Sequence, residues 1–218
     1  MAKIIPLSPV GTSAFNAAVV GAADVLKNGG IVAIPTDTVY GFTVTLPQSN
    51  KLYNLKQRSL LKPLGLCVAD VADIHRYATV TISDAVLHSL LPGPVTLVFT
   101  RTQHLPRDLN PDTNLIGIRI PDHDFTRALC RQLGEPIAQT SANLSGVGQS
   151  PLSVQEFKAL WTKIDMVIDG GRLSDSEVTR EGSTVVDLSV AGFYHIVRPG
   201  CARAGTEELL INAGLKSL

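Results

Sequence analysis

This sequence of 218 residues has no excess of charge of either sign. Its 19 Lys and Arg residues match 19 Asp and Glu residues, so the formal net charge is zero. Proteins that bind nucleic acid over a broad surface are usually basic, so direct binding of RNA or DNA has little support. A local basic patch is still compatible with this balance.

Cysteines are few, and clusters of metal ligands are absent. Cys67, Cys130 and Cys201 are odd in number and share no CxxC spacing, which favours reduced thiols in an intracellular protein. The sequence also lacks HxxxH, a Cys/His cluster and a paired-carboxylate spacing. Readings as a zinc protein, a hydrolytic metalloenzyme or a glycosidase therefore have no support, and no metal site is predicted.

Long apolar runs are absent as well. The longest, such as residues 115–120, have the length of a strand, so no membrane span is predicted. Residues 1–15 contain one lysine and no arginine, and they are too weakly apolar for a secretory signal. We expect a cytoplasmic protein. A mitochondrial fraction stays open, because no acidic residue precedes Asp24.

Short apolar runs alternate with helical patterns along the whole chain, which predicts one α/β domain. We expect helices over residues 15–28, 49–57, 83–90, 123–133 and 153–161 and from residue 206 on, and strands over residues 31–36, 64–69, 95–100, 115–120, 136–142, 166–170, 183–188 and 193–199. The last three strands follow one another like hairpins, which favours a mixed sheet over a purely parallel one.

Helix ends carry recognisable signals. Gly29 and Gly30 follow the first helix and can adopt the left-handed conformation that ends helices. Ser49, Ser83 and Thr206 are predicted N-caps. Ser153 with Glu156 is predicted to form a capping box.

Polar segments follow several strands, at the edge where α/β sheets usually bind ligands. Residues 35–41 contain Thr36, Asp37, Thr38 and Tyr40. These groups could bind a ligand, or the hydroxyls could satisfy the backbone of their own turn, which is the commoner arrangement.

Residues 56–64 supply the cations Lys56, Arg58 and Lys62. In an extended stretch Lys56 and Arg58 point to the same side, as a phosphate chain requires. The alternative is that they stabilise the carbonyls at a helix C-terminus. No GxxxxGK[ST] loop is present.

Arg119 lies in an apolar strand and therefore needs an internal partner or a ligand anion. His123, just beyond, is expected at the surface where a helix starts. Residues 139–146 offer Ser141, Asn143 and backbone N–H groups to an oxyanion, or they form an ordinary turn. There is no GxSxG elbow, so no nucleophilic serine is indicated.

Ser183 and Arg198 are each compatible with plain strand-end chemistry. Together, however, the polar segments offer cations, hydroxyls and backbone donors. This inventory suits electrostatic handling of a nucleotide and a small acid without a covalent enzyme intermediate.

The chain resembles the YrdC-type threonylcarbamoyl-AMP synthases from about residue 15 to residue 205. Seven segments are similar in order: GGIVAIPTDTVYGF, KQRSLLKPL, LLPGPVTLVF, GIRIPDH, PIAQTSANLSG, GSTVVDLS and VRPGCAR. Each is weak alone and the combination is specific. DLNP, GIRIPDH, VIDGG and STVVDLSV are most similar to the animal members.

The resemblance implies a single YrdC-like α/β domain, with a twisted mixed sheet flanked by helices and a deep, positively charged cleft. The expected organisation is an N-terminal extension over residues 1–14, the domain over residues 15–205, and a C-terminal helix and tail over residues 206–218. The longer family form has an additional C-terminal domain, which is not expected in this sequence.

The resemblance also implies an activity. The family makes threonylcarbamoyl-AMP and pyrophosphate from L-threonine, bicarbonate and ATP, with Mg²⁺ carried by the nucleotide and no permanently bound cofactor. A separate transferase then uses the product to modify the adenosine next to the anticodon of certain tRNAs. Contact of this chain with tRNA would be indirect or weak.

By the same resemblance, the KxR and SxN signatures are Lys56 with Arg58 and Ser141 with Asn143. Catalysis would rest on Lys56 and Arg58. The remaining roles divide between ATP, held by Arg58, Lys62, Ser141, Asn143 and Arg198, and threonine, held by Thr36, Arg119 and Ser183. Many members read KGRP where this chain reads KQRS, so the backbone at Gln57 is expected to differ.

Two other functions stay open. Carbamoyltransferases of the hydrogenase-maturation type contain a YrdC-like domain, but they are far longer and carry cysteine-rich zinc modules. A non-catalytic module that binds double-stranded RNA or tRNA would tend to lose the KxR and SxN residues, which this chain retains.

Overall fold

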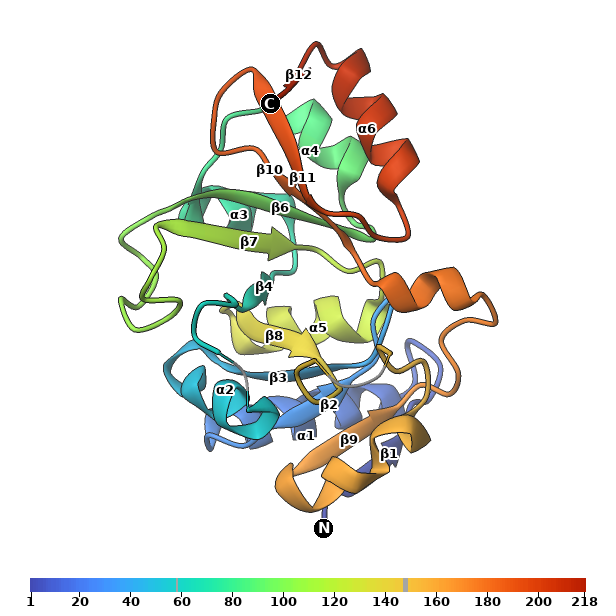
Figure 1. The fold of residues 1–218 in the computed structure, drawn as a ribbon. Coiled ribbons are helices and arrows are strands. Elements are labelled where there is room, and N and C mark those ends of the chain that lie inside the picture. Colours follow the sequence, from blue (N-terminus) through green and yellow to red (C-terminus); the bar gives the residue numbers. More distant parts are fainter. Residues whose placement is uncertain (58, 147–148) are drawn as a thin grey trace.

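One mixed β-sheet runs through the whole molecule, in a computed structural model that describes residues 1–57, 59–146 and 149–218. In Figure 1 the sheet twists from β1 and β9 near the N-terminus to β11 and β12 near the C-terminus. The elements are β1 Lys3–Pro6, α1 Ser13–Lys27, β2 Val32–Ile34, β3 Gly41–Thr45, η1 Leu46–Gln48, α2 Asn50–Lys56, β4 Gly65–Cys67, α3 Val71–Tyr77, β5 Ala78–Thr79, α4 Asp84–Leu90, β6 Val95–Arg101, β7 Leu115–Arg119, α5 Asp124–Leu133, β8 Ile137–Ser141, η2 Val154–Lys163, β9 Met166–Asp169, η3 Glu177–Glu181, β10 Thr184–Asp187, β11 Phe193–Arg198, α6 Arg203–Asn212 and β12 Lys216–Ser217.

The strand order is β1-β9-β2-β3-β8-β4-β7-β6-β10-β11-β12, with β5 paired to β6. Parallel pairs such as β4 with β7 and β6 with β10 alternate with antiparallel pairs such as β3 with β8. This confirms the predicted α/β domain with a mixed sheet flanked by helices. The predicted boundaries at residues 14 and 205 remain predictions.

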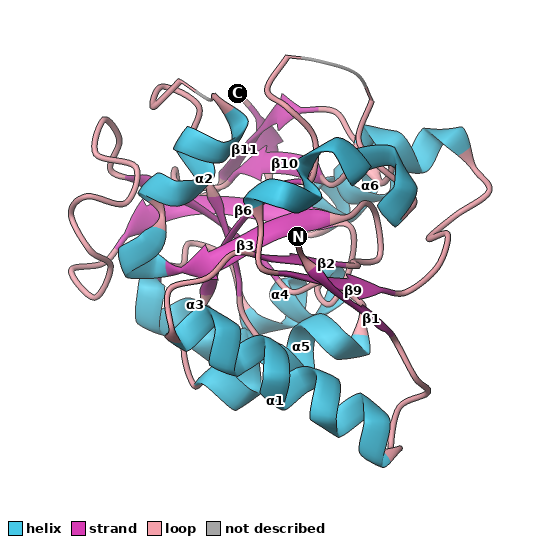
Figure 2. Cartoon of the chain, turned by 90° about the horizontal axis from the view of Figure 1, so that it is seen from below, coloured by secondary structure: helices cyan, strands magenta, loops and turns pink. Residues whose placement is uncertain are grey.

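Two hydrophobic cores lie on opposite faces of the strands, because successive strand residues point to opposite sides. In β2, Val32 and Ile34 belong to the core under α1 and α5, whereas Ala33 belongs to the larger core. Figure 2 shows α1 and α5 packed side by side against the sheet. Phe15 meets Phe125 edge to face there, with ring centroids 6.0 Å apart. The larger core includes side chains of α2, α3, α4 and α6.

Several predicted helix ends are confirmed. The side chain of Ser83 accepts a hydrogen bond from the backbone N–H of Val86 at the start of α4. Gly29, with φ of +80°, follows the end of α1 and bonds back to the carbonyl of Leu26 at 2.9 Å. Helix α1 therefore stops where the sequence predicts.

Two predicted caps are wrong. Ser49 has helical φ and ψ of −51° and −36° and makes no side-chain cap, because η1 runs directly into α2. Ser153 and Glu156 bond to each other at 3.1 Å instead of forming a capping box. Glu156 is drawn away by Arg180, whose Nη1 lies 2.5 Å from Oε2, and the segment that follows Ser153 is the 3₁₀ helix η2.

Two predictions near the C-terminus are also wrong. Helix α6 begins one turn before Thr206, so this hydroxyl donates to the carbonyl of Ala202 inside the helix. The three strands of residues 166–199 do not form successive hairpins. Of these three strands, β10 and β11 pair antiparallel with each other. Strand β9 lies between β1 and β2 at the other end of the sheet.

The sequence did not predict β1, β3 or α3. Strand β3 was hidden because Gly41 was interpreted as part of a turn, whereas it opens a fully buried strand. Among the described residues, none of the helices is long and apolar enough to cross a membrane.

Candidate active site

A cleft of about 520 Å³ opens over the centre of the sheet. Its floor includes Gly65 and Gly117, which face each other across β4 and β7 and carry no side chains. A Cβ atom at Gly117 would lie 3.0 Å from the Cγ2 atom of Thr96, a neighbour on β6. Because these positions are bare backbone, a ligand can approach the sheet itself.

Five of the predicted site residues line this cleft. Three lie in strands β7, β8 and β11, namely Arg119, Ser141 and Arg198, and two lie in the loops beside β2 and β10, namely Thr36 and Ser183. The structure therefore brings together segments that lie more than 160 positions apart in the sequence. The cleft is also lined by Asp112, Glu181 and Asp187, so its predicted positive charge stays a prediction.

Lys56 joins the first signature to the second. It is the last residue of α2 and only 2% exposed. Its Nζ donates to the carbonyl of Ser141, to Ser141 Oγ at 3.2 Å and to Asn143 Oδ1 at 3.1 Å. The Ser141 hydroxyl in turn donates to Asn143 Oδ1 at 2.6 Å. A buried ammonium is thus held at the edge of the cleft by neutral oxygens.

The end of α2 differs from the expected extended stretch. Lys56 is helical, and Gln57 adopts a left-handed conformation with φ of 51° at the end of α2. That conformation favours glycine, which matches the KGRP form of the family. Arg58, predicted to act in catalysis and ATP binding, lies outside the described residues.

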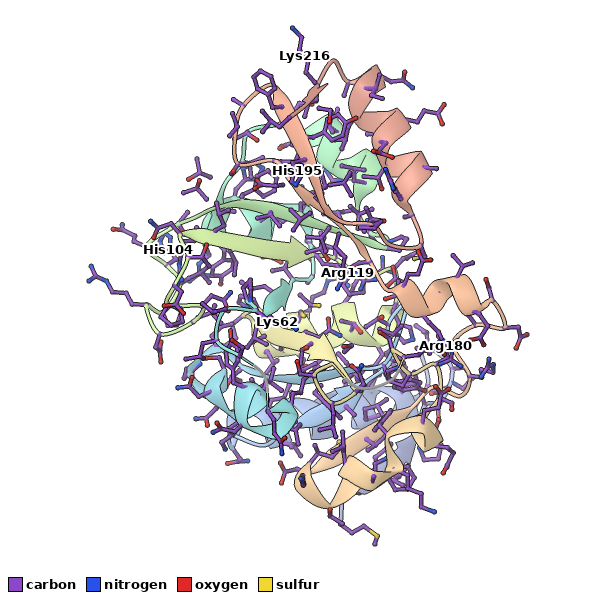
Figure 3. All side chains as sticks on the ribbon, viewed as in Figure 1. Lys62, His104, Arg119, Arg180, His195 and Lys216 are labelled. Carbon is purple, nitrogen blue, oxygen red and sulfur yellow. The ribbon has the colours of Figure 1, made fainter. Side chains whose placement is uncertain are left out.

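Lys62 lies in the loop before β4 and is exposed. It is not among the residues that line the cleft, although its neighbours Leu61 and Pro63 are. Figure 3 labels Lys62 and Arg119 in the middle of the molecule, in the region between β7 and β8.

Arg119 has an internal partner, which is one of the two alternatives predicted from the sequence. Its guanidinium forms an ion pair with Asp37 and donates to Thr38 Oγ1 at 3.0 Å. Asp37 Oδ2 also accepts from the backbone N–H of Asp122 at 3.0 Å. Arg119 Nε is buried, and among the described residues it has no hydrogen-bond partner. One donor of this fixed cation therefore remains for a ligand or water.

Thr36 forms the turn that was predicted as the commoner arrangement, and its role in ligand binding stays a prediction. Its hydroxyl donates to the carbonyl of Val39 at 2.8 Å and accepts from the N–H groups of Thr38 and Val39, as in a self-satisfied turn. It is buried and nevertheless lines the cleft. The turn therefore fixes the positions of Asp37 and Thr38 beside Arg119.

Ser183 and Arg198 meet at the far side of the cleft. Arg198 Nη2 donates to the carbonyl of Ser183 at 2.7 Å and to its Oγ at 3.2 Å. Gly200 makes this contact possible, since a Cβ atom there would lie 2.5 Å from backbone atoms of Ser183 and Thr184. The VRPG segment is therefore packed backbone to backbone against residues 182–184.

The segment before Ser183 is tied down by ion pairs. Arg180 contacts Glu177 and Glu156 and donates to the carbonyl of Ser150 at 3.1 Å. Figure 3 labels Arg180 beside η3. These contacts hold residues 177–182 near the site.

His123 was expected at the surface, but the structure places it less exposed than that. It is half-buried, and its Nδ1 has no hydrogen-bond partner among the described residues. Burial lowers the pKa of its imidazole, so the neutral ring is favoured at neutral pH.

Two residues that line the cleft were given no role by sequence reasoning. Asn110 is 1% exposed and binds Leu64 through both of its amide atoms. Gln139 lines the cleft and accepts a hydrogen bond from the Cys67 thiol. Gln139 stands two residues before Ser141, a spacing that places both side chains on one face of β8 and that could have identified it.

Comparisons with known proteins identify relatives of this chain. The sequence model named Sua5_yciO_yrdC and described as "Telomere recombination" matches residues 24–200. A threonylcarbamoyl-AMP synthase of Bos taurus is 49% identical over 195 residues, which cover 87% of this chain and 70% of the relative. The Homo sapiens protein of that name is 50% identical over 190 residues, covering 85% and 68%.

A solved structure is similar as well. The crystal structure of P. abyssi Sua5 complexed with L-threonine superposes with a TM-score of 0.83 at 28% identity. The alignment covers 98% of this chain and 62% of that one, so this chain spans less than two thirds of the Sua5 chain. The family match covers well over half of the chain and the animal relatives are about half identical, so the chain is a member of the Sua5/YciO/YrdC family.

Proposed function

We propose that this protein is a threonylcarbamoyl-AMP synthase. It would condense L-threonine, bicarbonate and ATP into threonylcarbamoyl-AMP and pyrophosphate. The observation that carries the proposal is the contact of Lys56 with Ser141 and Asn143 at the edge of a cleft whose other wall holds Arg119. The name shared by the animal relatives, which are about 50% identical, supports it.

The reaction has two steps that the site could serve. The threonine amine and bicarbonate first give a carbamate and water. A carbamate oxygen then attacks the α-phosphorus of ATP, the bond from that phosphorus to the bridging oxygen breaks, and pyrophosphate leaves. Negative charge accumulates around the α-phosphate, so fixed cations and N–H donors lower the barrier.

The proposal assigns six residues to the nucleotide: Lys56, Arg58, Lys62, Ser141, Asn143 and Arg198. Lys56 is the best supported, because its ammonium is already fixed within 3.2 Å of two side-chain oxygens of the second signature. A preorganised charge need not reorganise during the reaction, which is why it stabilises a transition state efficiently. ATP would bring Mg²⁺ with it, and no permanently bound cofactor is proposed.

The threonine end is assigned to Thr36, Arg119 and Ser183. The ion pair with Asp37 fixes the guanidinium of Arg119, and its buried Nε is left to receive an oxygen acceptor. Asp37 is poorly suited as a general base, because both of its carboxylate oxygens already accept hydrogen bonds. A substrate oxygen is therefore the better candidate to take the amine proton.

The product would pass to a separate tRNA threonylcarbamoyltransferase. Contact with tRNA is proposed to be indirect or weak, since the chain has no net charge. We propose a cytoplasmic location, and a mitochondrial share stays open.

The test is a reaction of the purified protein with Mg²⁺–ATP, bicarbonate and L-threonine, followed by mass spectrometry. We expect threonylcarbamoyl-AMP that depends on all three substrates, with serine and glycine as matched controls for the amino acid. A folded protein that binds ATP and forms no adenylate would contradict the proposed activity. Absence of ATP binding, together with a salt-dependent shift of RNA in a gel, would favour the non-catalytic RNA-binding module.

A further inference from the structure

The carboxamide of Gln139 is built into the floor of the cleft. Gln139 lies in β8, and its Oε1 accepts a hydrogen bond from the thiol of Cys67 in the neighbouring strand β4. Both residues line the cleft. This pair is separate from the Lys56 and Arg119 groups assigned above.

The Cys67 thiol gives the amide a fixed orientation. Burial raises the pKa of this thiol to about 12, so it stays protonated and neutral and can act as a donor. A donor selects the amide oxygen as its partner, which turns the Nε2 amino group away from Cys67. The amide therefore presents its two N–H bonds at a defined place.

Gly41 provides the room for this arrangement. A Cβ atom at Gly41 would lie 2.2 Å from Gln139 Nε2 and 2.9 Å from its Cδ. The amino group thus lies directly over the bare backbone of β3. Any other residue at position 41 would force the carboxamide to move.

The amino group has no hydrogen-bond partner among the described residues, although Gln139 lines the cleft. Buried or half-buried amides normally use their N–H groups. A donor that is oriented, neutral and left open indicates an oxygen acceptor on a ligand.

Its position also indicates which acceptor. On one side, Cys67 pairs with Arg119 across β4 and β7, at the proposed threonine end. On the other side, Ser141 follows on the same face of β8 and contacts Lys56, at the proposed nucleotide end. Gln139 therefore lies between the two ends, where the one-carbon unit that joins amino acid to nucleotide must lie.

We propose that Gln139 is a positioning and specificity residue whose carboxamide N–H groups bind a carboxylate oxygen of the carbamate derived from bicarbonate. This inference rests on the proposed function. One carbamate oxygen would accept from Nε2, and the other would remain free to attack the α-phosphorus of ATP. A neutral donor orients the group while withdrawing less charge from the attacking oxygen than a cation would.

The test compares Gln139→Leu with Gln132→Leu, which replaces an exposed glutamine on α5 outside the cleft lining. Initial rates are measured while bicarbonate, threonine and ATP are varied in turn. For Gln139→Leu we expect the KM for bicarbonate to rise about 10- to 100-fold, as for one lost hydrogen bond to a charged group. The KM values for threonine and ATP should change by less than about threefold, and Gln132→Leu should behave like the wild type.

Cys67 supplies a second, independent readout. Cys67→Ala removes the donor that orients the amide and should raise the KM for bicarbonate by less than Gln139→Leu does. Cys67→Ser retains a donor and should restore most of the loss. In the Gln139→Leu background, Cys67→Ala should add nothing further, because the two residues act through one interaction.

The outcomes separate this inference from the proposed function. An active wild type with unchanged bicarbonate dependence in both Gln139→Leu and Cys67→Ala would overturn the role of Gln139 and leave the synthase intact. An equal rise in all three KM values would indicate general damage to the site and would also overturn it. A folded wild type that makes no adenylate would overturn the proposed function, and this inference with it.

Discussion

A single buried ammonium distinguishes this site from an ordinary basic surface. Exposed lysines bind phosphate as mobile, hydrated charges, whereas Lys56 is 2% exposed and held by Ser141 and Asn143. A buried charge is costly unless it is well hydrogen-bonded. The oxygens of Ser141 and Asn143 lower that cost, and they carry no formal charge themselves.

Lys56→Met should abolish most of the activity and leave the fold intact. Methionine fills a similar volume and removes the charge, and loss of one preorganised electrostatic contact typically lowers kcat about 100- to 1,000-fold. Rates of adenylate formation and the circular dichroism spectrum would be measured together. The matched control is Lys51→Met on the same helix, where the lysine is exposed and binds the carbonyl of Gly29. Wild-type turnover in Lys56→Met would contradict the assigned role.

Loops between elements carry half of the site, and a single side chain ties two of them together. Asn110 Oδ1 accepts from the N–H of Leu64 at 2.8 Å and from the Tyr53 hydroxyl at 2.9 Å, while Nδ2 donates to the carbonyl of Leu64 at 2.9 Å. Asn110 therefore pairs with the end of the Lys62 loop as a neighbouring strand would, and it links that loop to α2.

Asn110→Ala should destabilise the protein and weaken nucleotide binding. The change leaves the buried backbone N–H and carbonyl of Leu64 without partners and removes one hydrogen bond of Tyr53. It also puts alanine at a φ of 51° that favours glycine or asparagine. We expect a loss of about 2–4 kcal/mol in the free energy of unfolding, measured by urea denaturation. We also expect the KM for ATP to rise more than the KM for threonine. Asn110→Gly relieves only the backbone strain. If it restored the KM for ATP, the hydrogen bonds would not be what positions the loop.

Over the whole molecule, the sequence predicts the layers better than the contacts. Periodic segments such as residues 83–90 and 115–120 become α4 and β7, because local burial patterns decide them. Glu156 was assigned to a capping box, but its carboxylate binds Arg180, which lies 24 residues further along the chain. Nothing local to Glu156 signals that partner.

The same limit applies to the candidate site. The types of residue at Lys56, Ser141 and Arg119 indicated anion chemistry, but their mutual contacts depend on the register of β4, β7 and β8. The depth of the cleft depends on Gly65 and Gly117 facing each other. That is a property of strand pairing, which neither glycine reveals alone.

Because the cleft is assembled from distant segments of one sheet, a ligand that bridges its walls should stabilise the whole fold. A ligand that binds only the folded state, at 100 times its Kd, adds about 2.7 kcal/mol to the free energy of unfolding. For a domain of this size that corresponds to a rise in Tm of about 5–10 °C. We expect this rise with Mg²⁺–ATP in differential scanning fluorimetry, and a further rise when threonine is added.

Lys56→Met provides the comparison that makes this thermal shift specific. If the nucleotide binds where Lys56 meets Ser141, the variant should lose most of the rise with Mg²⁺–ATP and keep the rise with threonine alone, because the threonine end rests on Arg119 and Asp37 instead. An equal shift with ATP in both proteins would mean that the nucleotide binds elsewhere. Loss of both shifts would mean that the two ends of the cleft do not form independently, and that the buried ammonium organises the whole site.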